Sequence, residues 1–173
     1  ARAYPAEACV GPSPRGGRRA AARAAQAAAA LARPRDARAM QVTLALLADA
    51  ANVSREGKLN LLGNFDTIYA RSFPTAHAHM QLVLRFEADA SEVGTTRTLE
   101  VTLVAPDGSV VGRVPGRLAV PRPEAGEVSR VDHILTLTNV TFAGPGRYTF
   151  QIALDGVVLR TVALRVEQIP VAH

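Results

Sequence analysis

Residues 135–150 carry the clearest structural pattern in the chain, which reads Leu135-Thr-Leu137-Thr-Asn-Val140-Thr-Phe-Ala-Gly-Pro-Gly146-Arg-Tyr148-Thr-Phe150. Apolar and polar residues alternate on both sides of a Gly-Pro-Gly turn. Alternation with a period of two is typical of a β-strand with one buried face, and Gly and Pro mark the turn between two such strands. The pattern therefore predicts two consecutive strands joined by a tight connection.

The same alternation recurs through residues 40–173 and predicts eight short strands. Asp107-Gly108 and Asp155-Gly156 are strong hairpin signals, because glycine accepts the positive φ that a type I′ turn requires. No segment has the length and period of a helix that would connect parallel strands. We therefore expect an all-β domain over residues 40–173, an antiparallel β-sandwich of about seven to eight strands. The alternating apolar sets run Val42–Leu46, Leu59–Tyr69, Met80–Phe86, Leu99–Leu103, Val110–Val120, Leu135–Leu137, Tyr148–Leu154 and Val158–Val166.

Two of these strands are less regular than the others. Leu44 and Leu46 would also suit a short helix, but the β-branched Val42 favours a strand. Pro115 lies inside the fifth strand, where it cannot donate a ladder hydrogen bond. We therefore expect the fifth strand to be an edge strand or to be broken at Pro115.

The stretch from Leu135 to Phe150 resembles the corner between the fifth and sixth strands of immunoglobulin-like domains, where a Tyr stands two residues before a core position. Phe150 occupies the position of the second disulfide cysteine, and the chain has no Trp for the usual core packing. The resemblance therefore implies an immunoglobulin-like sandwich without its disulfide. It also implies that Tyr148 buries its ring and returns its hydroxyl to a nearby backbone group, which removes Tyr148 as a catalytic candidate.

Four segments near the start of the domain resemble the opening of a small bacterial family of unknown function. They are Leu46-Leu-Ala-Asp49, Arg55-Glu-Gly-Lys-Leu-Asn60, Leu62-Gly-Asn-Phe-Asp66 and Ala70-Arg-Ser-Phe-Pro74. Members of that family start near the residue aligned with Met40. The family has no assigned activity, so the resemblance implies no mechanism and no functional residue.

Residues 1–39 differ sharply in composition from the rest of the chain. They hold 16 Ala and eight Arg but few larger apolar residues, so they cannot bury a core. Their net charge is +6, which leaves −1 for residues 40–173 of a chain that carries +5. We expect this leader to lie outside the fold, as upstream sequence read through ahead of a natural start at Met40. The alternatives are a secretory or organelle presequence and a basic arm that binds nucleic acid.

Residues 40–173 offer little catalytic chemistry. The single Cys9 lies in the leader and can neither close an intrachain disulfide nor build a cysteine-based zinc site. No Gly-x-Ser-x-Gly nucleophile motif and no phosphate-binding glycine loop occurs. No run approaches the roughly 18 apolar residues of a membrane-spanning helix. We therefore expect a non-enzymatic protein without a cofactor or membrane contact, in the cytoplasm.

His77 and His79 form a possible metal site. They lie two residues apart in extended chain, so their imidazoles point to the same side, a geometry that can seat a metal ion. Two ligands do not make a metal site, and a third would come from His133, Asp66 or Asp132. The alternative is that both are solvated loop histidines. His133 itself shares the strand parity of its apolar neighbours, which favours a hydrogen-bonded core or edge histidine.

Polar residues gather on one predicted strand face and in the loop that follows it. Asn60, Asn64 and Asp66 lie opposite the apolar face of the predicted strand Lys58–Tyr69. In the next loop, Phe73 would present an aromatic anchor on a backbone stiffened by proline. A solvent-exposed sheet face would show the same polar stripe. The predicted interaction surface comprises Asn60, Asn64, Asp66, Arg71, Phe73, His77 and His79.

Binding is the function that these observations favour. We expect a β-sandwich that binds a partner protein or a second copy of itself through a sheet face, a free strand edge or the loop Arg71–His79. A metal-binding protein or metal-dependent enzyme that uses His77 and His79 is the first alternative. Nucleic-acid binding through the Arg-rich leader is the second, because the charge balance does not favour it for the domain.

Overall fold

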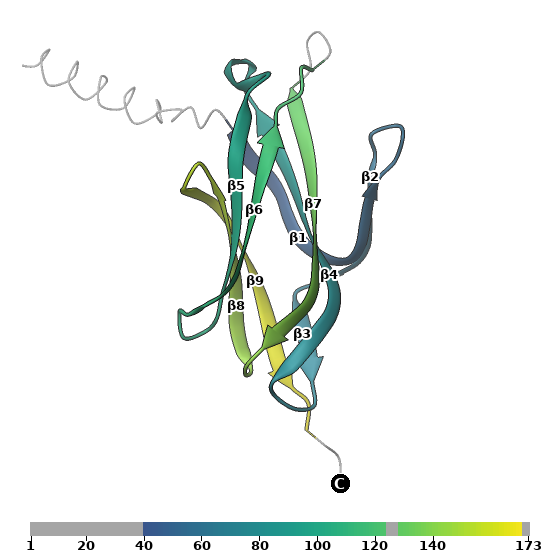
Figure 1. Cartoon of the computed structure of the whole chain (residues 1–173). Helices are drawn as coiled ribbons and strands as arrows, with labels where there is room; N and C mark the ends of the chain where they lie inside the picture. The colour runs from purple at the N-terminus through teal and green to yellow at the C-terminus, as the bar shows by residue number, and fades with distance from the viewer. Residues whose placement is uncertain (1–39, 124–127, 171–173) are drawn as a thin grey trace, which may run out of the picture. The chain divides into compact units, whose positions relative to one another are not determined.

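The computed structural model describes residues 40–123 and 128–170, and it contains nine strands and one short 3-10 helix there (Figure 1). The strands are β1 (Met40–Val53), β2 (Leu59–Phe65), β3 (Thr67–Ala70), β4 (Thr75–Ala88), β5 (Thr96–Val104), β6 (Val110–Ala119), β7 (Ser129–Phe142), β8 (Gly146–Leu154) and β9 (Val157–Gln168), and the helix η1 (Ala90–Glu92) lies between β4 and β5.

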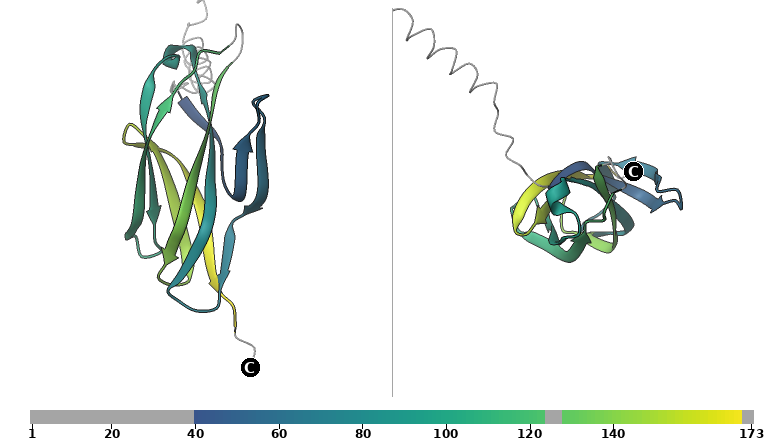
Figure 2. Two further views of the ribbon diagram at one scale, coloured as in Figure 1. Left: turned by 45° about the vertical axis from the view of Figure 1, so that its right-hand side comes forward. Right: turned by 90° about the horizontal axis from the view of Figure 1, so that it is seen from above.

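These strands form two sheets that pack face to face (Figure 2). Sheet A has the strand order β2-β1-β4-β7, and sheet B has the order β3-β9-β8-β5-β6. The antiparallel pair β4–β7 corresponds to strands B and E of an immunoglobulin domain, and β5–β8–β9 corresponds to strands C, F and G. The predicted immunoglobulin-like β-sandwich is therefore confirmed.

One strand pair departs from the predicted antiparallel arrangement, because β3 runs parallel to β9. The prediction of one continuous strand over Lys58–Tyr69 is wrong. The chain leaves sheet A after Phe65 and joins sheet B at Thr67. At the crossing, the backbone N–H of Arg165 donates to the carbonyl oxygen of Asp66 at 2.8 Å. This division of the second predicted strand accounts for the ninth strand.

The two less regular strands of the prediction are both continuous. β1 is a strand over its whole length, and β6 runs through Pro115 as the outer strand of sheet B. An edge strand has one side without a ladder partner, so it tolerates the missing N–H of proline. The expectation that Pro115 lies in an edge strand is confirmed.

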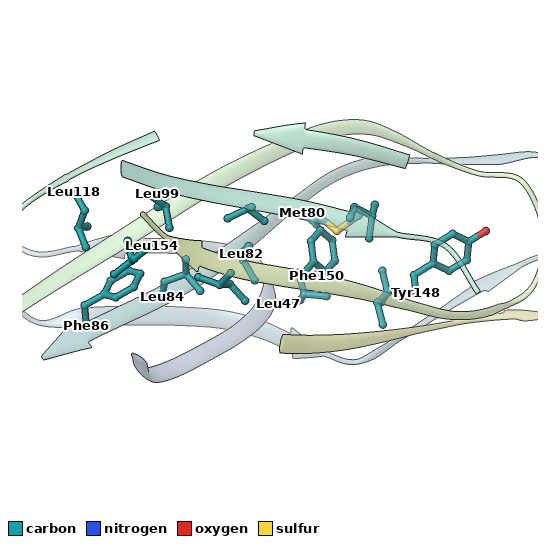
Figure 3. Close-up of a cluster of buried hydrophobic side chains, with 14 of the residues drawn as sticks. Leu47, Met80, Leu82, Leu84, Phe86, Leu99, Leu118, Tyr148, Phe150 and Leu154 are labelled. Atoms are coloured by element: carbon teal, nitrogen blue, oxygen red, sulfur yellow. The ribbon is translucent and has the colours of Figure 1, made fainter. Parts of the chain in front are cut away.

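The core lies between the facing surfaces of the two sheets (Figure 3). Alternate residues of β4 from Met80 to Phe86 are completely buried, and they pack in one cluster with Phe150 and Leu154 of β8. Fully burying one such aliphatic or aromatic side chain stabilises a fold by about 1.5–3 kcal/mol. The two-residue period in the sequence therefore corresponds to the buried faces of the sandwich.

Tyr148 anchors the connection between β7 and β8. Its ring is buried and lies edge-on to Phe142, with ring centroids 4.8 Å apart. Its hydroxyl donates to the carbonyl oxygen of Gly144 at 2.9 Å and accepts from the backbone N–H of the same residue at 3.4 Å. Gly146 has φ 145°, and a Cβ there would lie 2.5 Å from Cγ of Pro106. The expected role of Tyr148 at an immunoglobulin-type corner is confirmed.

The expectations about the leader concern residues 1–39, which lie outside the described residues. Among the residues that the structure describes, no helix is long and apolar enough to cross a membrane.

Replacement of Tyr148 by phenylalanine tests the corner. Tyr148→Phe keeps the buried ring but leaves the Gly144 carbonyl without its donor, so we expect a loss of about 1–2 kcal/mol in the free energy of unfolding. Urea denaturation measures this loss. The matched control is Tyr69→Phe, because Tyr69 is 63% exposed and should lose nothing measurable. Equal stabilities of the two variants would contradict this role for the hydroxyl.

Candidate functional site

The hairpin formed by β1 and β2 separates from the rest of sheet A. Pairing of β1 with β4 ends at Ala48 and Gln81, whereas pairing of β1 with β2 continues to Val53 and Leu59. The Gln81 side chain caps the point of separation: its Oε1 accepts from the backbone N–H of Ala51, and its Nε2 donates to Thr136 Oγ1 at 3.3 Å. Figure 2 shows the hairpin standing apart from the two layers.

Gly63 provides the bend in the hairpin. Its φ is 65°, a left-handed conformation that side-chain-bearing residues rarely adopt. A Cβ at this position would also collide with the carboxylate of Asp49 on the opposite strand. Position 63 therefore requires glycine both for its backbone conformation and for the space that Asp49 occupies.

A groove of about 960 Å³ lies between the hairpin and the outer face of sheet A. Leu44, Leu59 and Leu61 contribute apolar surface to it. The same groove holds a bidentate ion pair, in which Arg85 Nε lies 2.7 Å from Asp132 Oδ1 and the other Asp132 oxygen accepts from Nη2 at 2.9 Å. The hydrogen bond to Asp132 raises the pKa of Arg85 above its ordinary value. This pair is satisfied internally and offers no free charge to a ligand.

The predicted polar stripe lies on this hairpin and at its end. Asn60 and Asn64 are exposed on β2, and Asn60 Nδ2 donates to Asn52 Oδ1 at 2.8 Å. Asp66 follows β2 and accepts from the Thr67 hydroxyl at 2.9 Å. The opposite face of β2 is not the buried apolar face that the alternation predicted, because Leu61 is 40% exposed. Within residues 40–123 and 128–170, no second sheet covers this face of the hairpin, whereas sheet B covers the inner face of β4.

The predicted loop anchor has a different environment from the one expected. Phe73 is half-buried, packs against the core cluster and precedes a cis peptide bond to Pro74. Arg71 is exposed, and its carbonyl oxygen accepts from Gln168 Nε2 at 3.4 Å. The expectation that Phe73 projects into solvent is therefore wrong, since its ring contributes to the packing between the sheets.

His77 and His79 lie on β4 in different environments. His79 is exposed beside Thr138, whereas His77 is half-buried with its ring centroid 5.8 Å from that of Phe65. The Nε2 atom of His77 is buried without a hydrogen-bond partner in the described part of the chain. No three His, Cys, Asp or Glu side chains converge there as metal ligands would. The structure therefore supplies no third ligand for the possible metal site.

His133 lies on the inward side of β7 opposite Leu84 of β4, as its parity predicted. It is half-buried on the outer strand of sheet A, which makes it an edge histidine. Burial lowers the pKa of His133, because desolvation disfavours the charged imidazolium.

A second groove, which the sequence did not predict, lies between the edge strands β6 and β7. It measures about 460 Å³, and the buried side chains of Val101, Leu103 and Phe150 reach its floor. Val114 of β6 and Leu137 of β7 line its walls. Pro115 indicated from the sequence that β6 is an edge strand. The sequence could not show which strand lies opposite β6, because that depends on pairing between distant segments. The groove lies over buried core side chains and beside an edge of β7 that pairs with no further strand among the described residues.

Alanine at Gly63 tests the bend of the hairpin. A left-handed backbone costs an alanine about 1–2 kcal/mol, and the collision with Asp49 adds to this cost. Gly57→Ala is the matched control, because Gly57 has φ 76° but no atom near its added Cβ. We expect Gly63→Ala to lower the unfolding free energy more than Gly57→Ala, as measured by urea denaturation. Adding Asp49→Ala should recover the difference, and no recovery would contradict the proposed collision.

No curated protein matches the chain. Two of the solved structures that match the chain cover about three quarters of its length. One is the alkylpurine DNA glycosylase AlkC of Pseudomonas fluorescens bound to DNA with an abasic site analog, at 8% identity and a TM-score of 0.42. This match covers 75% of the present chain but 30% of the glycosylase, so the chain spans less than a third of that protein.

The other is an immunoglobulin-like protein of Pseudomonas aeruginosa, at 10% identity and a TM-score of 0.40, with coverage of 74% of this chain and 96% of that one. A family described as "Family of unknown function (DUF6941)" matches residues 43–167. This match confirms the resemblance to a family of unknown function that the segments between Leu46 and Pro74 indicated. The chain belongs to this family of unknown function, DUF6941.

Proposed function

We propose that the domain is a binding module that takes up an extended polypeptide segment along the free edge of β7. The observation that carries the proposal is the groove between β6 and β7, which lies over core side chains next to a strand edge that has no ladder partner among the described residues. Addition of a strand to a sheet edge is a common mode of peptide recognition. Main-chain hydrogen bonds supply affinity in this mode, and pockets for alternate side chains supply specificity.

The edge strands of the two sheets differ in how well they are protected against strand addition. β3 has four residues, and β6 contains Pro115, features that protect natural sheet edges. β7 has 14 residues and contains no Pro, Gly or Lys. Its backbone bends at Asn139, where φ is 51°. Among the described residues this long edge has unpaired backbone donors and acceptors, and its charged side chains, Arg130 and Asp132, are engaged in ion pairs with β4 and do not line the groove.

The groove supplies the apolar part of the site. Its volume falls within the range of about 300–1,000 Å³ that is usual for ligand pockets. An added strand would direct every second side chain toward the floor formed by Val101, Leu103 and Phe150. Each aliphatic side chain that becomes fully buried there contributes about 1.5–3 kcal/mol. The groove therefore favours a segment in which apolar residues alternate with polar ones.

A free segment fits this site better than the β7 strand of a second copy. The inward side chains of β7, such as Leu135 and Leu137, already pack in their own sandwich. The β7 strand of a second copy could pair its backbone but could not place those side chains in the groove. An extended segment has both faces free, so it can pair with β7 and fill the groove together.

Charge beside the groove favours acidic residues in the segment. Arg113 lies on the groove wall, and in the described ranges no carboxylate lies within ion-pair distance of it. On the β7 side, Asp132 is neutralised by Arg85 and Arg130 by Glu87. An acidic side chain flanking the apolar positions would therefore meet an uncompensated guanidinium.

Selection from a library of random linear peptides tests the proposal with the full chain as target. We expect the selected peptides to alternate apolar and polar residues and to carry Asp or Glu. A synthetic copy of one peptide should bind Val111→Glu at least about tenfold more weakly, because a negative charge at the groove rim opposes apolar burial and repels the acidic residues of the peptide. Fluorescence polarisation measures this affinity. Val158→Glu is the matched control, since Val111 and Val158 are exposed to 40% and 47%.

Amide hydrogen exchange locates the bound peptide independently. The complex should protect backbone amides of β7 and leave those of β2 unchanged. The proposal is overturned if no peptide is enriched, if Val111→Glu binds as tightly as Val158→Glu, or if protection appears away from β7.

A further inference from the structure

We infer that β2 is a self-association surface that pairs antiparallel with β2 of a second copy, about a two-fold axis at Leu62. This inference goes beyond the proposed function and does not depend on it, because β2 and β7 are opposite edges of sheet A. The pairing would join two sheets A into one continuous sheet.

The exposed edge of β2 has the properties of an unprotected strand. Leu62 is 70% exposed, and Leu61 is exposed beside it. The seven residues of β2 include no charged side chain and no proline, two features that usually protect a sheet edge, and the one irregularity within it is the bend at Gly63. The hairpin stands away from the two layers (Figure 2), so a second chain can approach β2 without meeting the body of the sandwich.

The sequence of β2 is complementary to itself when read in the opposite direction. Antiparallel pairing about Leu62 places Asn60 opposite Asn64 of the second copy and Leu59 opposite Phe65 of the second copy. Amide–amide and apolar–apolar pairs are both favourable across strands. Leu62 faces its own copy at the axis. A two-fold interface requires this kind of self-complementary surface.

The residues at the two ends of the paired segment also complement one another. The same register brings Lys58 opposite Asp66 of the second copy, and the two-fold axis produces this ion pair twice. Both side chains are exposed in the single chain. Next to the axis, Leu61 faces Gly63 of the second copy, where the absence of a side chain leaves room for the leucine. Opposite charges and matched sizes therefore select a single register.

The size of the contact sets the strength expected of the dimer. Stable complexes bury about 1,200–2,000 Å² of surface, and pairing over seven residues at one edge is a smaller contact. We therefore expect a dimer with a micromolar dissociation constant. In that dimer the two β7 edges would lie at opposite ends of the joined sheet, so it would present two copies of the proposed peptide site.

Charge substitution at Leu62 tests the two-fold axis by sedimentation velocity on the full chain. Leu62→Lys and Leu62→Glu each place like charges opposite one another, so each variant alone should dimerise at least about tenfold more weakly than the unmodified chain. An equimolar mixture of the two variants should restore dimers, because Lys then faces Glu. Val157→Lys is the control at an exposed apolar residue of β9, and it should dimerise like the unmodified chain.

Thermal melting of each variant shows that the fold is intact, since Leu62 makes few contacts within its own chain. The inference is overturned if the unmodified chain stays monomeric at high micromolar concentration, or if Leu62→Lys dimerises normally. It is also overturned if the mixture of folded variants stays monomeric. Because Leu62 is remote from the groove at β7, each of these results leaves the peptide-binding proposal untouched.

Discussion

Burial of alternate side chains between β4 and β8 holds the two sheets face to face, and the other strand pairs depend on it. A slip of one residue would turn Met80 or Phe150 from the core into solvent, so the buried faces fix the register. Tyr148 secures the connection that carries the chain from sheet A to sheet B, through its hydrogen bonds to Gly144. Within this frame, β1 can leave β4 at Gln81, because its earlier residues are already held by pairing and packing.

Core burial leaves the backbone donors and acceptors at the outer edges of the sheets without ladder partners among the described residues. Both proposed binding modes use these edges. β7 and β2 are the two edges of sheet A, but they differ in what lies behind them. Behind β7 a groove lined by Val114 lies over buried core side chains, so this edge suits a segment with a free apolar face. In the part of the chain that the structure describes, no second sheet covers the hairpin that carries β2, so this edge suits a partner strand whose own faces match it. One physical feature, an unprotected strand edge, thus leads to two kinds of partner.

The sequence predicted what depends on local pattern, and it failed where pairing between distant segments decides the structure. Period-two alternation identified the strands, and the residues around Tyr148 identified the corner, because both signals lie within a few neighbouring positions. The change of sheet at Asp66 is accompanied by a hydrogen bond from Arg165, 99 positions away along the chain, so alternation could not show it. For the same reason Phe73 was expected in solvent. Asn60 and Asn64 were predicted to lie on an interaction surface because they are polar. Their self-complementary spacing indicates pairing with a second copy only once β2 is known to be an edge strand.

Amide hydrogen exchange of the full chain at low concentration, resolved residue by residue by NMR, tests the central claim that β7 and β2 are free edges. The account predicts that amides of β4 and β8 are protected throughout, because both strands have partners on each side. In β7 and β2, protection should alternate, since every second amide points away from the neighbouring strand. Uniform protection along β7 or β2 in the monomer would mean that another part of the chain covers that edge, and it would contradict the account.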